Sequence, residues 1–283
     1  MRPSRKSVFL VFLCGVWSLA AFAREYSGTR GIAHSGALRG AASLNEGIYH
    51  NPATFAFSQK YAIEMASGVS PSSDREPYTG WLFGGSVVDA HSPLIAGGLG
   101  YYTETRKVRH GEQNKNVFHA ALSKILSDYF SAGVTGKYSG VSQPSGERHT
   151  FEIDVGTYVV LSPKVQAGIV GHNLLAQDEA PERTFAMGAR IQIADFFHVN
   201  TDILKRIDGP GFRNVSLLTS FEVIKENGLN FQGGLALSDR SDKNLYSLGT
   251  GWSEHKLAVS YAFQNSMNGR FGQIHALSLR VFF

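Results

Sequence analysis

FEIDVGTYVVLSPKVQAGIVGH, residues 151–172, alternates apolar and polar side chains with a period of two. Phe151, Ile153 and Val155 are apolar, whereas Glu152 and Asp154 between them are charged. A surface helix repeats its apolar positions about every three to four residues, whereas a strand places alternate side chains on opposite faces. The segment therefore predicts two strands joined by a tight turn, with one apolar face and one charged face.

The same period of two continues from Tyr61 to the last residue of the chain. We expect fourteen strands of about 8 to 13 residues each, the length that a tilted membrane-spanning strand requires. Their approximate ranges are 60–69, 78–88, 94–104, 116–126, 129–138, 149–161, 165–174, 183–192, 196–206, 215–224, 229–237, 245–252, 256–265 and 273–283.

The links between these expected strands alternate in length. RKVRHGEQNK (106–115) and SGVSQPSGER (139–148) are long and polar, whereas SDY (127–129) and SPK (162–164) are tight turns. Outer-membrane barrels have this organisation, with longer loops outside and short turns in the periplasm. The pattern predicts an all-β fold, a transmembrane antiparallel up-and-down β-barrel, in preference to a soluble β protein. Residues 106–116 are expected to form its longest loop.

An even number of strands puts both ends of the barrel on the side of the short turns. The last expected strand is amphipathic and ends in Phe283. A terminal aromatic residue in this place resembles the signal that the barrel-assembly machinery of the outer membrane reads. This machinery, outer-membrane lipid and lipopolysaccharide are therefore the expected partners.

Residues 1–23 have the organisation of a secretory signal peptide, because Arg2, Arg5 and Lys6 precede an apolar run that ends in AFA. The run is about 15 residues long, which is shorter than a spanning helix requires. Removal of these three bases lowers the formal net charge from +4 to +1, so no nucleic-acid partner is expected. The single cysteine, Cys14, leaves with the segment, which excludes a disulfide or a thiolate site in the remaining chain.

Residues 24–57 differ from the expected barrel, residues 58–283, because small residues dominate and the period of two is absent. The segment also carries apolar residues such as Ile32, Leu38 and Phe55, so it is too apolar for a solvated tail. Small residues allow backbones to approach closely. We therefore expect a compact plug inside the barrel.

TRG (29–31), GA (36–37) and NPA (51–53) lie in this segment. With them the segment resembles the N-terminal hatch of the FadL-like outer-membrane transporters and of the related PorV-like barrels. The resemblance implies fourteen strands, two periplasmic termini, an occluded lumen, and uptake of small hydrophobic compounds across the outer membrane of a Gram-negative-type bacterium. The candidate plug and transport residues are Arg30, Gly31, Gly36, Ala37, Arg39, Asn51, Pro52 and Ala53.

The FadL-like transporters of long-chain fatty acids are longer and build a capture groove from large outer loops. The loops expected here are short and charged. A structural or interaction barrel that serves secretion or anchors partners at the surface, as PorV-type proteins do, therefore remains the alternative to uptake. An open polar pore would require that the plug does not fill the lumen.

If the apolar side of each strand faces lipid, the opposite side carries charges into the lumen. These expected lumen charges are Glu64, Lys137, Glu152, Asp154, Arg190, Asp202, Glu222 and Arg280. Five acids face three bases, whereas the plug carries a small excess of positive charge. We hypothesise that Arg30 or Arg39 pairs with a wall carboxylate such as Glu152, Asp154 or Asp202 through charge-assisted hydrogen bonds. The alternative is that the wall charges are solvated.

Catalysis, metals and cofactors are not expected. His119 with Ser123, and His172 with Asn173, are the candidate hydrolase pairs, but neither comes with a nucleophile-elbow pattern or a third group at a suitable spacing. The histidine and carboxylate spacings of zinc and EF-hand sites are absent from the sequence.

Overall fold

The computed structural model describes residues 26–41, 44–71, 79–92, 95–108, 111–144, 146–175, 182–207, 214–239, 244–268 and 273–283. The expected signal peptide lies outside these ranges. Within them, fourteen strands form one closed barrel. The strands are β1 Tyr61–Ser70, β2 Gly80–Asp89, β3 Ala96–Val108, β4 Gly111–Ser127, β5 Phe130–Gln143, β6 Gly146–Ser162, β7 Val165–His172, β8 Thr184–Ala194, β9 Phe197–Arg206, β10 Val215–Ile224, β11 Leu229–Ser238, β12 Leu245–Ser253, β13 Leu257–Ser266 and β14 Ile274–Phe282.

Every strand pairs antiparallel with its neighbours in the chain, and β14 closes the barrel on β1. Ile63 lies opposite Val281 in this closing pair, and the backbone N–H of Phe283 donates to the carbonyl oxygen of Tyr61 at 3.0 Å. Closure gives each strand a partner on both sides, which a sheet in lipid requires because no water is there to satisfy an open edge. The predicted fold class is thereby confirmed.

Two of the expected loops are strand instead. Strands β3 and β4 extend to Val108 and from Gly111, so most of residues 106–116 pair across one hairpin, with Arg106 opposite Gln113. In the same way, β5 and β6 extend through most of residues 139–148. The prediction of long loops here was wrong because the alternation of apolar and polar residues ends where the strands leave the lipid. The hydrogen-bonded pairing of the strands continues into water, with polar side chains on both faces.

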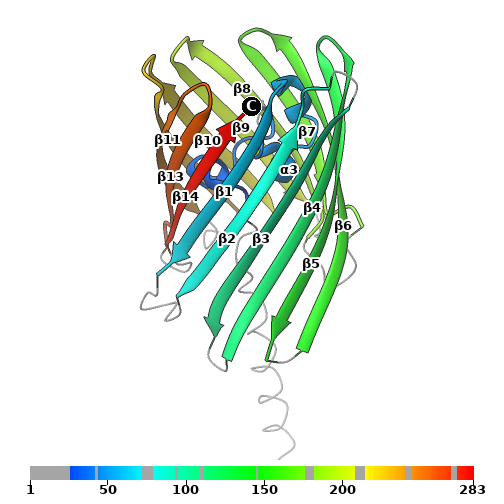
Figure 1. Ribbon diagram of the computed structural model, residues 1–283, viewed down its shortest axis with the longest axis vertical. Helices are drawn as coiled ribbons and strands as arrows, with labels where there is room; N and C mark the ends of the chain where they lie inside the picture. The colour runs from blue at the N-terminus through cyan, green and yellow to red at the C-terminus, as the bar shows by residue number, and fades with distance from the viewer. Residues whose placement is uncertain are drawn as a thin grey trace, which may run out of the picture.

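The outward side of the barrel is apolar and exposed. Trp81, Phe151 and Leu122 expose 61%, 58% and 55% of their surface, and similar side chains occur on every strand. Apolar surface of this extent is costly in water and favourable in the hydrocarbon of a bilayer. We call the end of the barrel where β1 begins and β14 ends the turn end, and the opposite end the loop end. Strands β3–β6 reach furthest at the loop end, which is the lower end of the view (Figure 1).

The N-terminal segment lies inside the barrel, as the blue ribbon shows (Figure 1). It contains α2 Thr29–Ala33, α3 Gly47–His50 and the 3-10 helix η1 Phe55–Ser58. We call residues 26–58 the plug, of which 42 and 43 are not described. Most of its described side chains are buried. The helices of the described chain are all too short or too polar to cross a membrane.

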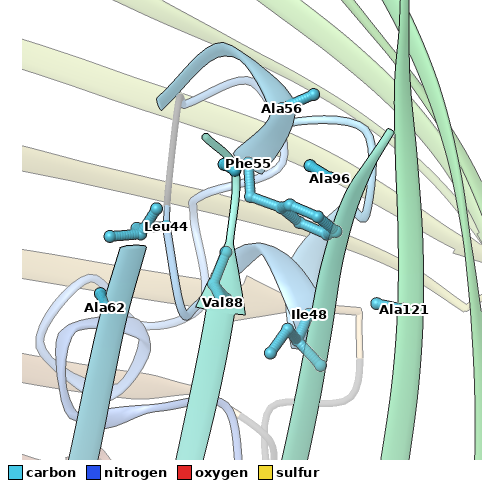
Figure 2. Packing of buried hydrophobic residues seen from close by; sticks show 9 residues of the cluster. Leu44, Ile48, Phe55, Ala56, Ala62, Val88, Ala96 and Ala121 are labelled. Carbon is cyan, nitrogen blue, oxygen red and sulfur yellow. The ribbon is translucent and has the colours of Figure 1, made fainter. Parts of the chain in front are cut away.

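An apolar cluster joins the plug to the turn end of β1–β4. Leu44, Ile48 and Phe55 of the plug lie against small residues and Val88 of the wall (Figure 2). The wall residues of the cluster are Ala62, Val88, Ala90, Ala96 and Ala121. Burial of a side chain as large as Ile48 or Phe55 contributes about 1.5–3 kcal/mol. This side of the plug is therefore held by ordinary hydrophobic packing.

On β5–β8, glycines of the wall allow the plug backbone to lie directly against the strands. A Cβ atom on Gly168 would lie 2.2 Å from the carbonyl oxygen of Arg39, and one on Gly133 would lie 2.5 Å from the carbonyl carbon of Pro52. Contacts of this length are shorter than van der Waals separation, so a side chain at either position would displace the plug. A Cβ atom on Gly156 would lie 2.1 Å from Oδ1 of Asn51, and one on Gly188 would lie 2.9 Å from the backbone nitrogen of Gly40.

We predict that Gly168→Ala loosens the plug without opening the barrel, because the added methyl group must push the chain at Arg39 away from β7. Hydrogen exchange at residues 37–53 should become at least tenfold faster, whereas exchange in the strands should change little. Gly97→Ala is the matched control, since a Cβ atom there has no other atom within 4 Å. Equal plug exchange in the two variants would contradict the close contact.

Candidate functional site

The candidate site is the interface between the plug and the charged inner wall. The plug meets the wall charges in three groups of ion pairs. The first group surrounds Glu222 of β10. Arg30 of α2 donates from Nη2 to Glu222 Oε2 at 2.9 Å and from Nε to Oε1 at 3.3 Å, and Arg190 of β8 donates to Oε2 at 3.0 Å. One carboxylate is therefore shared by an arginine of the plug and an arginine of the wall.

The second group runs from β9 through the plug to β6. Asp202 Oδ2 accepts hydrogen bonds from the backbone N–H of Arg39 at 3.0 Å and from its Nη1 at 3.1 Å. Arg39 Nε donates to His172 Nε2 at 3.2 Å, and His172 Nδ1 contacts Asp154 Oδ2 at 2.9 Å. Because Nε2 of the imidazole accepts, Nδ1 carries the proton and donates to Asp154. Lys137 Nζ lies 3.0 Å from the other oxygen of Asp154.

The third group joins the plug to the strands that close the barrel. Arg280 of β14 contacts Glu46 of the plug and Glu64 of β1, and its Nε donates to Glu64 Oε2 at 2.6 Å. Glu46 and Glu64 are 1% and 4% exposed. A single arginine therefore bridges two buried carboxylates, one from the plug and one from the wall.

The Asn51–Pro52–Ala53 motif attaches to the wall through neutral groups. Asn51 Nδ2 donates to the carbonyl oxygens of Arg39 at 2.9 Å and of Thr157 at 3.0 Å, and its Oδ1 accepts from the N–H of Ala53 at 3.1 Å. Ser131 Oγ donates to the carbonyl oxygen of Ala53 at 2.6 Å. The motif thus ties two parts of the plug to each other and to β5 and β6.

The remaining candidate plug residues are also at this interface or within the plug. Gly31 faces His50, where a Cβ atom would lie 2.4 Å from the imidazole Nε2. Gly36 has a φ of +84 and Gly28 has a φ of +82, a left-handed conformation that favours glycine. Ala37 is fully buried in a small cluster with Leu218. Their part in transport stays a prediction.

All eight expected lumen charges point inward, and each one contacts an opposite charge. The hypothesis for Arg39 is confirmed by its pair with Asp202. Arg30 also pairs with an expected wall carboxylate, Glu222, which was not among the three examples given. Glu152 lies 3.6 Å from Lys137 of the wall. Which wall charge faces which plug residue depends on how the plug folds, and strand periodicity carries no information on that.

Phe283 lies at the turn end with 68% of its surface exposed. Its ring packs edge-to-face on Tyr61, with the ring centroids 5.5 Å apart. A role in assembly stays a prediction for this residue.

Sequence reasoning missed a group of rings between the plug and β3–β4. Tyr26 and Tyr49 of the plug pack on each other, Tyr26 packs on Tyr102, and Tyr49 packs edge-to-face on His119 at 5.0 Å. A signal for Tyr102 was present, because Tyr101 and Tyr102 are consecutive in a strand and one of them has to face the lumen. The positions of Tyr26 and Tyr49 in an irregular segment carried no such signal.

Burial and charge both act on the titratable groups of the plug. Burial raises the pKa of Glu46, but Arg280 and Arg30 outweigh it, so the pKa of this carboxyl lies below its ordinary value. Burial lowers the pKa of His34, although Glu222 opposes this, and burial together with Arg39 and His172 lowers the pKa of His50 well below its ordinary value. The docked plug therefore favours neutral imidazoles and a charged Glu46.

We predict that Arg39→Met weakens docking of the plug by about 3–5 kcal/mol, because it leaves Asp202 as a buried charge without its partner. The readout is hydrogen exchange of the plug in the folded barrel. Arg206→Met is the matched control. Its partner Glu182 is half exposed, so that pair contributes about 0–1 kcal/mol. Equal exchange in both variants would show that the Arg39 pair does not hold the plug.

We also predict that acid weakens docking. An undocked histidine has a pKa of about 6.5, whereas the pKa values of docked His34 and His50 lie below this. As the pH falls below about 6.5, the undocked state binds more protons, so the docking free energy decreases. Because the pKa of Glu46 is also lowered in the docked state, protonation of this carboxyl decreases the docking free energy further at still lower pH.

The measurement is plug hydrogen exchange at pH 7.5 and pH 5.5, corrected for intrinsic rates. The plug should lose protection at the lower pH, and the double variant His34→Gln, His50→Gln should lose much less of its own protection between the two. Protection that rises toward pH 5.5 in the natural sequence would refute the assignment of neutral imidazoles.

No protein-family model matches the chain, and no curated protein matches it by sequence. Solved structures match it over nearly its whole length. The toluene transporter TbuX of Ralstonia pickettii has a TM-score of 0.69 at 11% identity, covering 90% of this chain and 98% of that one. A Pseudomonas aeruginosa FadL homologue has a TM-score of 0.65 at 13% identity, with 93% and 99% covered.

The monoaromatic hydrocarbon channel CymD has a TM-score of 0.61 at 12% identity, covering 90% of this chain and 96% of that one. These three barrels and the present one share their architecture over almost the full length of each chain. Their sequence identities are low, so the similarity shows a common fold and nothing more. The chain is a FadL-like barrel in its fold.

Proposed function

We propose that the chain takes up small hydrophobic compounds through a plugged barrel in the outer membrane of a Gram-negative-type bacterium. The observation that carries this proposal is a plug attached to the wall by ion pairs and hydrogen bonds at three separate places. Polar contacts of this kind can exchange for water or ligand contacts, unlike a continuous apolar core. The similar barrels named as toluene and hydrocarbon transporters support this substrate class.

In this proposal the loop end faces outside and the turn end faces the periplasm. A ligand enters from the loop end, and the plug rearranges locally to open a path. The rearrangement involves Gly28 and Gly36, which both have a positive φ that favours glycine. Asn51, Pro52 and Ala53 are the attachment that has to loosen on β5 and β6. Phe283 serves the assembly machinery, and lipid and lipopolysaccharide surround the wall.

The second candidate is a PorV-like barrel that holds a protein partner at the surface. The observation that favours it is the long polar hairpins β3–β4 and β5–β6, which extend furthest at the loop end. Thr105 Oγ1 donates to Asn114 Oδ1 at 2.7 Å across the first hairpin, and Ser139 and Thr150 share a hydrogen bond across the second. A partner that co-purifies in a fixed ratio and is lost when these hairpins are shortened would support this candidate.

We predict that the refolded protein conducts little in a planar bilayer and that deletion of residues 26–57 opens a large steady conductance. The deletion removes the groups that fill the lumen, whereas the closing pair of β1 and β14 remains. Uptake of toluene should be faster by cells whose lipopolysaccharide-containing outer membrane carries the full protein than by matched cells without it. Folding of both forms is checked by their shift in gel mobility on heating.

Equal conductance with and without the plug would contradict an occluded lumen. A silent full-length protein that also fails to accelerate uptake, and that binds a protein in a fixed ratio, would favour the second candidate.

A further inference from the structure

A cavity of about 180 Å³ lies between the plug and β4, β5 and β7–β9. It is on the loop side of the plug, since His172 ends β7 there and Thr184 begins β8 there. An apolar cavity of about 150 Å³ accommodates benzene. The volume is therefore sufficient for a compound with one six-membered ring.

The lining of this cavity contains two cations, Arg39 and Lys137, together with three imidazoles. Arg39, His50, His119, Lys137 and His172 all contribute to it, and no Asp or Glu does among the described residues. Asp154 and Asp202 contact these cations but do not line the cavity. The charged donors presented to a ligand are thus Arg39 and Lys137, and the carboxylates that pair with them, Asp202, Asp154 and Glu152, lie outside the lining.

Arg39 has donor capacity left for a ligand. Its Nε donates to His172, and its Nη1 donates to Asp202 and to the carbonyl oxygen of Gly36 at 2.8 Å. Its Nη2 makes no hydrogen bond to any residue of the described ranges. A guanidinium carries five N–H donors in one plane, and a carboxylate oxygen is the acceptor that suits the free ones best.

Another part of the lining is aromatic and apolar. Tyr26, Tyr49 and Leu204 contribute to it. Tyr26 and Tyr49 pack edge-to-face with their centroids 5.7 Å apart, and Tyr49 packs on His119. Preformed rings of this kind favour offset or edge-to-face contact with a further ring.

We propose that this cavity binds a single-ring aromatic carboxylate of the size of benzoate. The ring packs among Tyr26, Tyr49 and Leu204, the carboxylate accepts hydrogen bonds from Arg39, and the positive charge of Lys137 in the lining attracts the carboxylate. This proposal narrows the substrate class of the proposed function, because it adds an acidic group to the hydrophobic compound. It rests on the proposed function for the direction of transport. Binding itself is measurable without transport.

The test is ¹⁹F NMR titration of the refolded full-length chain in nanodiscs with 4-fluorobenzoate. Fluorobenzene is the probe that lacks the carboxylate, and a fluorinated hexanoate is the probe that lacks the ring. Empty nanodiscs correct for partition into lipid. We expect saturable binding of 4-fluorobenzoate, with a Kd at least tenfold lower than that of either other probe.

Variants at two positions locate the site. Leu204→Trp fills the cavity and leaves every ion pair intact, so it should abolish binding. Lys137→Gln removes one cation and should raise the Kd at least tenfold, whereas Lys137→Arg should retain most of the affinity. The gel mobility shift on heating shows whether each variant forms a closed barrel, and Leu204→Trp alone decides the location if Lys137→Gln does not fold.

Several results would overturn the proposal. Equal affinity for fluorobenzene would show that no anion is recognised, and equal affinity for the hexanoate would show that no ring is recognised. Binding that survives Leu204→Trp would place the site elsewhere. If the chain binds no 4-fluorobenzoate but its conductance depends on the plug, the proposed site is contradicted and the proposed transport function is not. If it binds 4-fluorobenzoate but supports no uptake, the transport function is contradicted and the binding site is not.

Discussion

Charged side chains of the inner wall need partners in a lumen from which the plug displaces water, and the rest of the structure depends on this constraint. Asp202, Glu222 and Glu64 are nearly inaccessible. An unpaired carboxylate at such a place would cost several kcal/mol. Each of the three contacts an arginine, and in every group at least one charged member comes from the plug. The charged groups of the plug therefore pair with charged groups of the barrel wall in all three groups.

Ion pairs of this kind hold the plug in one position more than they add to overall stability. Desolvation of both partners offsets much of their attraction, so the net contribution of an intact buried pair is small, although loss of one partner is expensive. Hydrophobic packing of Ile48 and Phe55 near the turn end and close backbone contact at Gly133 and Gly168 supply attachment that does not depend on charge. A plug held in these two ways can loosen on its polar side while its apolar side stays in place.

Much of the barrel was predictable from the sequence, because lipid on one side imposes a period of two that residues 151–172 display openly. The same period identified Glu64, Asp202 and Glu222 as inward-facing. Two things were not predictable. The pairing of Arg30 with Glu222 depends on the path of an irregular segment across the lumen, and the polar hairpins at residues 106–116 and 139–148 continue the ladder where lipid no longer imposes a pattern. The cavity at Arg39 and His172 likewise required the folded plug.

The plug occupies the lumen in one defined position, and an engineered disulfide across its interface with the wall tests this position. Ser35 of the plug and Ser247 of β12 lie with their hydroxyl oxygens 2.7 Å apart, and the chain has no cysteine after Cys14. Ser35→Cys with Ser247→Cys should oxidise readily and completely in the folded barrel, since hydroxyl oxygens this close place the two thiol sulfurs within reach of each other. Ser35→Cys with Ser123→Cys, on β4, should stay reduced. Free thiols in the first pair, or equal cross-linking in both pairs, would contradict a plug docked as described.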